Sequence, residues 1–128
     1  MNIESPDLDV EQRPVLIIDD DLGIRETLSL ILESQGYAVL TASDGQDALR
    51  ILKGASQLPG IILLDLMMPV MNGWQFLENV SHDERLAGIP IIVVTAFSAG
   101  LPVIQPKAVL TKPLNLNLLL ETVAKYCI

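Results

Sequence analysis

The sequence predicts an α/β domain in which a doubly wound, five-stranded parallel sheet is covered by helices on both faces. Five short apolar runs, each too short for a helix, alternate along the chain with longer amphipathic segments. Within these runs polar residues do not alternate with apolar ones, which indicates that the strands are buried on both faces and therefore pair in parallel. Strand–helix alternation of this kind connects through right-handed crossovers and produces a doubly wound fold.

The first strand is expected at Val15–Ile18, a run of four aliphatic residues. A helix is predicted over Leu22–Gln35, ending before Gly36, because apolar residues recur there at helical spacing. The residues predicted to face the core are Ile24, Leu28, Ile31 and Leu32. A second strand is predicted at Ala38–Thr41.

A second helix is predicted at Gln46–Lys53, with Ser43 or Asp44 as its N-terminal cap, because both side chains can accept a backbone hydrogen bond there. The third strand, Ile61–Leu64, is again aliphatic throughout. It is followed by a helix that begins with Gly73–Val80.

The last part of the domain is predicted to contain strands at Ile91–Val94 and Ala108–Leu110 and a helix at Asn115–Tyr126. The first of these strands follows Pro90, which is compatible with the start of a strand. The final helix is expected to turn four apolar residues inward, namely Leu116, Leu119, Leu120 and Val123.

Composition and charge narrow the range of functions. The chain has 128 residues, half of them hydrophobic, which suits one compact domain at 14–128 after a flexible, polar lead-in at 1–13. A net charge of −8 makes nucleic acid and anionic membrane poor partners and favours a cation or a basic protein surface. One cysteine, Cys127, and the lack of a signal-like or membrane-spanning run predict a cytoplasmic protein.

Polar or charged residues follow four of the five predicted strands. Asp19–Asp21 follow the first strand, Asp65 the third, Thr95 the fourth and Lys112 the fifth. In open parallel sheets, ligands bind beyond the carboxyl ends of the strands, so these groups are expected to meet at one rim.

This set of groups fits phosphoryl transfer. Several carboxylates form a hard-oxygen site for Mg²⁺, and one of them can act as a nucleophile toward phosphorus. The cation and Lys112 would neutralise charge on the phosphoryl group, and the Thr95 hydroxyl can donate a hydrogen bond to it. They would also offset the repulsion among the three consecutive aspartates.

Five stretches of the chain, read together, resemble the receiver domain of two-component response regulators. They are "VLIIDDD", "GYAVLTASDGQDAL", "LDLMMPVMNGWQF", "IIVVTA" and "LTKPL", and the similarity extends from about residue 14 to residue 127. The resemblance implies a flavodoxin-like sheet of strand order 2-1-3-4-5. It also implies a protein that takes a phosphoryl group from a sensor histidine kinase or a histidine phosphotransfer protein and signals by protein contact. Such a protein catalyses only its own phosphorylation and dephosphorylation.

The resemblance assigns a role to each matching position. It makes Asp65 the phosphoacceptor and gives Mg²⁺ the ligands Asp20, Asp65, the Met67 backbone carbonyl and, through water, Asp19. It makes Thr95 the switch hydroxyl and Lys112 the phosphoryl-binding cation, and it places Met67 and Phe97 beside the path of the hydrolytic water. Asp21 is expected to cap the following helix. A cis bond at Lys112–Pro113 is implied, and it suits the tight turn needed there.

Two positions depart from the family pattern. Val109 stands three residues before Lys112, where receivers usually carry an aromatic residue. The segment "AFSAGLPVIQPK" is short and contains Gly100, Pro102 and Pro106, which disfavour a helix. We therefore expect a shortened or missing fourth helix and a remodelled output face.

Several alternatives remain. Asp19–Asp21 could be only a capping cluster, and Thr95 an ordinary strand residue. The chain could be a receiver module of a larger hybrid kinase or transcription regulator, or a binding module that never takes phosphate. FMN binding is disfavoured because three aspartates would repel its phosphate. A haloacid-dehalogenase-type phosphatase would need an acid at Met67.

Overall fold

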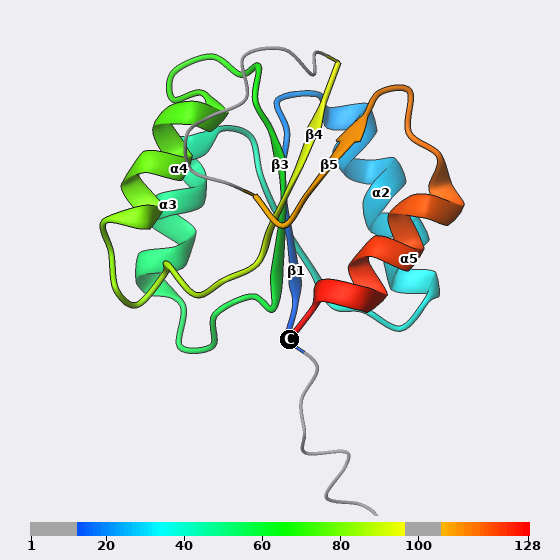
Figure 1. The fold of residues 1–128 in the computed structure, drawn as a ribbon, viewed down its shortest axis with the longest axis horizontal. Helices are drawn as coiled ribbons and strands as arrows, with labels where there is room; N and C mark the ends of the chain where they lie inside the picture. Colours follow the sequence, from blue (N-terminus) through cyan, green and yellow to red (C-terminus); the bar gives the residue numbers. More distant parts are fainter. Residues whose placement is uncertain (1–12, 97–105) are drawn as a thin grey trace, which may run out of the picture.

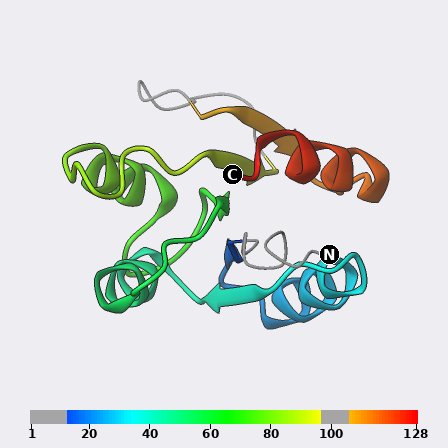
Figure 2. The ribbon, with the colours of Figure 1, turned by 90° about the horizontal axis from the view of Figure 1, so that it is seen from below.

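The computed structural model describes residues 13–96 and 106–128. Five strands form one sheet, and four helices within these ranges pack on its two faces (Figures 1 and 2). The strands are β1 (Val15–Ile18), β2 (Val39–Ala42), β3 (Ile61–Asp65), β4 (Ile91–Thr95) and β5 (Ala108–Thr111). The helices are α2 (Leu22–Ser34), α3 (Gly45–Gly54), α4 (Gly73–Ser81) and α5 (Leu116–Tyr126).

The sheet is parallel throughout and has the order β2-β1-β3-β4-β5, which confirms the predicted topology. The chain places β2 on one side of β1 and then β3, β4 and β5 on the other, so the winding switches between β1 and β3, which lie side by side. Register pairs Ile18 with Leu64, so the next residues, Asp19 and Asp65, lie at the same level of the sheet. This arrangement brings the ends of β1 and β3 together.

Two apolar layers hold the helices on the sheet. On one face, α3 and α4 pack over Leu16, Ile18 and their neighbours, and on the other face α2 and α5 pack over Val15 and Ile17. The alternating residues of β1 therefore supply both layers, as expected for a central parallel strand. The edge strand β2 is different, because Leu40 and Thr41 are exposed.

Each of the four helices in the described ranges begins directly after a residue whose side chain caps its N-terminus. The side chain of Asp21 accepts a hydrogen bond from the Ile24 amide, which confirms its predicted role, and Asp44, rather than Ser43, caps α3. Asn72 and Asn115 cap α4 and α5 in the same way. After α2, Gly36 has a φ of 94°, a left-handed conformation that glycine adopts without strain.

One predicted core position is wrong. Leu116 is 45% exposed, whereas Leu119 and Val123 are buried. Leu116 is the first residue of α5 and lies beyond the edge of the apolar layer. Helical spacing alone therefore predicted burial for a residue that is exposed.

Two predictions fall largely outside the described residues. They are the flexible lead-in at 1–13, of which only Arg13 is described, and the reduced fourth helix between Thr95 and Ala108, which involves residues 97–105. Val109, which replaces the usual aromatic, is half-buried against the layer formed with α3 and α4. Across the two described ranges, no helix is long and apolar enough to cross a membrane.

Candidate functional site

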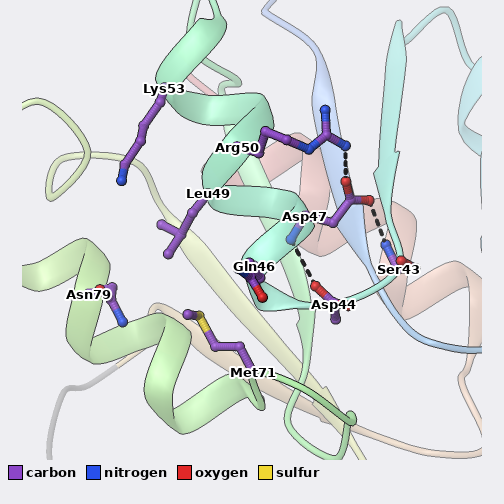
Figure 3. A pocket seen from close by; sticks show the side chains of 9 residues that line it. All are labelled: Ser43, Asp44, Gln46, Asp47, Leu49, Arg50, Lys53, Met71 and Asn79. Atoms are coloured by element: carbon purple, nitrogen blue, oxygen red, sulfur yellow. Dashed lines mark hydrogen bonds and ion pairs between the residues drawn. The ribbon is translucent and has the colours of Figure 1, made fainter.

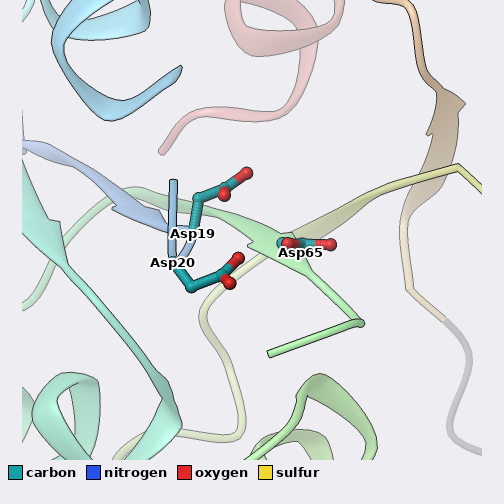
Figure 4. Close-up of side chains that lie close together, drawn as sticks. All are labelled: Asp19, Asp20 and Asp65. Atoms are coloured by element: carbon teal, nitrogen blue, oxygen red, sulfur yellow. The ribbon is translucent and has the colours of Figure 1, made fainter. Parts of the chain in front are cut away.

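Three carboxylates gather where β1 and β3 leave the sheet. Each of Asp19, Asp20 and Asp65 offers an oxygen, and these oxygens lie within 4.8 Å of one another. Figure 4 shows Asp19 and Asp20 projecting from the end of β1 toward the side on which Asp65 lies. Asp19 and Asp65 are buried and Asp20 is exposed. The predicted acidic group is therefore assembled, with one member facing solvent.

Lys112 closes this cluster from the end of β5. Its Nζ lies 3.2 Å from Oδ2 of Asp19 and 3.7 Å from Oδ2 of Asp65. The Lys112 amide donates to the Thr95 carbonyl at 2.9 Å, and the Lys112–Pro113 bond is cis, as predicted. The ammonium group therefore offsets part of the repulsion among the aspartates.

Thr95 occupies the last position of β4 and is fully buried. It pairs in register with Thr111, and the preceding residue, Val94, pairs with Asp65. These pairings place Thr95 at the same rim as Asp65 and Lys112. Phe97, the other predicted residue of this strand end, lies outside the described residues.

Burial raises the pKa of Asp65 above its ordinary value of 3.8. The Met67 amide, which donates to Oδ1 at 3.2 Å, and the Lys112 ammonium group act in the opposite direction, while the charges of Asp19 and Asp20 add to the rise. The net effect is that ionisation of the Asp65 carboxyl group is less favourable in the folded protein than in water. A cation or a modification that removes that cost would be favoured here.

The loop between β3 and α4 forms one wall of the site. Met67 is half-exposed at its start, next to Asp65, and its backbone carbonyl remains only a predicted metal ligand. Val70 has a φ of 65°, a conformation that is strained for a β-branched residue. At the end of the loop, a Cβ on Gly73 would lie 2.6 Å from Leu66 Cα and 2.8 Å from the Asp65 carbonyl oxygen. Only glycine lets the loop return so close to Asp65.

Sequence reasoning missed one residue of the site. The guanidinium of Arg25, on α2, donates from Nη1 to the Asp19 carbonyl oxygen at 2.6 Å. A signal was present, because Arg25 is the only basic residue between Pro14 and Leu49 in a markedly acidic chain.

A groove of about 860 Å³ lies elsewhere, between α3 and α4 (Figure 3). Its wall includes Asp44, which caps α3 by accepting from the Asp47 amide, and Asp47, whose carboxylate pairs with Arg50. None of the clustered aspartates lines it. The acidic cluster at the ends of β1 and β3 therefore lies outside this groove.

Similarity to known proteins extends over most of the chain. The sequence matches the family described as response regulator receiver domain over residues 15–124. The chain is 31% identical to protein PilH of Pseudomonas aeruginosa, a similarity that covers 85% of this chain and 93% of PilH. It is 38% identical to the probable transcriptional regulator ycf27 of Guillardia theta over 70% of this chain and 34% of that protein.

Solved structures show the same fold. The chemotaxis response regulator CheY4 of Vibrio cholerae superposes with a TM-score of 0.80 at 31% identity, covering 91% of this chain and 99% of that one. The present chain spans about a third of the length of several transcriptional regulators that it matches, including ycf27 and RpaA of Synechocystis.

Proposed function

The chain belongs to the family of response regulator receiver domains, and we propose that the Asp65 carboxylate accepts a phosphoryl group with the help of Mg²⁺. The observation that carries this proposal is the position of Asp65 within the acidic cluster, 3.7 Å from Lys112. The raised pKa of Asp65 fits the same role, because the fold holds that charge in a partly desolvated place.

The residues present fit a magnesium ion. Three carboxylate oxygens from separate side chains lie within 4.8 Å of one another, and hard oxygen ligands are those that Mg²⁺ prefers. Asp20 and Asp65 would bind it directly with the Met67 backbone carbonyl, and Asp19 through water. A bound Mg²⁺ would neutralise negative charge on the phosphoryl oxygens.

The transfer itself would be a nucleophilic displacement at phosphorus. A carboxylate oxygen of Asp65 forms the new O–P bond, the P–N bond to the donor phosphohistidine breaks, and its electron pair stays on the imidazole nitrogen, which takes up a proton. Lys112 would pair with the phosphoryl oxygens, and the Thr95 hydroxyl would donate a hydrogen bond to one of them. The protein thus acts on itself, as a signalling module.

The donor would be a sensor histidine kinase or a histidine phosphotransfer protein, and the signal would pass by protein contact in the cytoplasm. A second arrangement is also supported. Because the chain covers about a third of several transcriptional regulators, it could act as the receiver module of such a larger protein. Both arrangements use the same chemistry at Asp65.

Incubation with acetyl phosphate and Mg²⁺, followed by mass spectrometry, tests the proposal. We expect one phosphoryl group per chain on wild type and none on Asp65→Asn, and Asp20→Ala should lose the Mg²⁺ dependence. Glu78→Gln, an exposed acid on α4, is the matched control and should be labelled like wild type. Label at another residue, or undiminished label in Asp65→Asn, would reject it in favour of a phosphate-independent binding module.

A further inference from the structure

The contact between Arg25 and the Asp19 carbonyl is not explained by the stability of α2. Arg25 is the fourth residue of this helix, where a cation interacts unfavourably with the helix dipole. Its guanidinium instead turns to the end of β1 and donates to the Asp19 oxygen at 2.6 Å in a partly buried setting. The contact therefore serves the loop that follows β1.

Asp19 is held at every one of its polar atoms, by partners from several elements. The Asp19 amide donates to the Ala42 carbonyl at 3.1 Å, Oδ1 accepts from the Asp21 amide at 2.9 Å, and Oδ2 faces Lys112. The remaining acceptor is the carbonyl oxygen, which Arg25 holds. All four interactions fix Asp19 before any ligand binds.

Asp20 has no comparable support. Its side chain is exposed and makes no hydrogen bond to the protein within residues 13–96 and 106–128. The peptide unit that joins it to Asp19 is planar, so the orientation of this unit sets where the Cα of Asp20 lies. The Arg25 contact sets the orientation of that plane, because it fixes the carbonyl oxygen in it.

We propose that Arg25 is a positioning residue for the divalent cation: it orients the Asp19–Asp20 peptide so that the Asp20 carboxylate points at Asp65. The inference rests on the proposed function, because it assumes that Mg²⁺ binds the acidic cluster. Mutation of the groups that hold the ligands of a metal typically lowers its affinity by roughly 10- to 100-fold.

The direction of the change in Mg²⁺ affinity distinguishes a positioning role of Arg25 from a simple effect of its charge. Removal of the Arg25 charge makes the surroundings of the cluster more negative, so a charge effect alone would strengthen Mg²⁺ binding. Loss of positioning would weaken it. The direction of the change in affinity therefore separates the two effects.

The test is titration of the unphosphorylated protein with Mg²⁺ by isothermal calorimetry. We expect Arg25→Met to weaken binding about tenfold, and Arg25→Lys, which keeps a donor and a charge, to lie between it and wild type. Arg50→Met removes the same charge from the exposed surface of α3 and should bind like wild type. In an Asp20→Ala background, Arg25→Met should weaken binding no further.

Melting temperatures measured in EDTA separate positioning from general damage. If Arg25→Met melts far below wild type, Arg25→Lys and the Asp20→Ala background supply the decisive affinities. Equal or tighter Mg²⁺ binding by Arg25→Met overturns the positioning role and leaves the proposed function intact. Failure of wild type itself to bind Mg²⁺ overturns both.

Discussion

Lys112 Nζ lies 3.2 Å from Oδ2 of Asp19, although the two residues are 93 positions apart in the chain. The contact links the end of β5 to the end of β1 across the carboxyl edge of the sheet. It places a positive charge against a buried carboxylate in a protein with a net charge of −8.

Lys112→Met should therefore destabilise the domain. The substitution leaves Asp19 and Asp65 buried without their cation, and we expect a loss of roughly 1–3 kcal/mol in the free energy of unfolding. Urea denaturation in EDTA measures it. The double variant with Asp65→Asn should recover part of the loss, because one unpaired charge is then removed. A Lys112→Met protein as stable as wild type contradicts this account of the ion pairs.

The pH dependence of the free energy of unfolding should reflect the raised pKa of Asp65. A carboxyl group whose pKa is raised on folding binds protons more tightly in the folded state, so stability falls as pH rises from the ordinary value of 3.8 through the raised value. Asp65→Asn removes this loss. In EDTA, the variant should melt a few degrees above wild type at pH 7.

The difference between those two proteins should shrink as pH falls toward 4, because Asp65 becomes protonated in both states. Thermal unfolding followed by circular dichroism across this range provides the measurement. The contributions of acids remote from the cluster cancel in the comparison. If the difference in melting temperature between Asp65→Asn and wild type grows as pH falls, the pKa of Asp65 is not raised by folding.

Mg²⁺ should stabilise wild type by neutralising the same cluster. At a free concentration of 100 times Kd, linkage gives about 2.7 kcal/mol. Asp65→Asn and Asp20→Ala should gain much less. Thermal shifts with Mg²⁺ and with K⁺ at equal ionic strength distinguish specific binding from screening. An equal response to the two salts would contradict a magnesium site.

Gly73→Ala tests the close return of the β3–α4 loop. The added Cβ would lie under 3 Å from the backbone of Leu66 and Asp65, so we expect a destabilisation of about 1–3 kcal/mol and slower phosphorylation. Gly54→Ala, at the end of α3, meets no atom within 4 Å and is the matched control. It should be neutral or slightly stabilising. Equal stabilities of the two variants would show that the loop can shift freely.

The phosphorylated state should be long-lived. Met67, half-exposed beside Asp65, and Phe97 cannot orient an attacking water as an amide or a carboxylate can. Met67→Asn and Phe97→Glu should each speed the loss of phosphate several-fold, measured by the decay of radiolabelled protein. Unchanged decay in both variants would remove these side chains from any role in hydrolysis.

The sequence alone determined the elements and the members of the acidic rim. Aliphatic runs such as Val15–Ile18 have one stable place in a small α/β domain, between two layers of helices. Capping residues such as Asp21 act within one turn of themselves. Asp65 and Lys112 were predictable because each immediately follows such a run, and the parallel sheet brings those ends together.

Only the tertiary structure decided how these groups interact. The raised pKa of Asp65 depends on its burial and on the charges of Asp19 and Asp20, which are remote in sequence. The Arg25 contact depends on where α2 turns back over β1. Leu116 has helical spacing but lies beyond the apolar layer, so periodicity misplaced it. Local patterns encode secondary structure because their energies arise between near neighbours, whereas distances and charge environments arise from packing between distant segments.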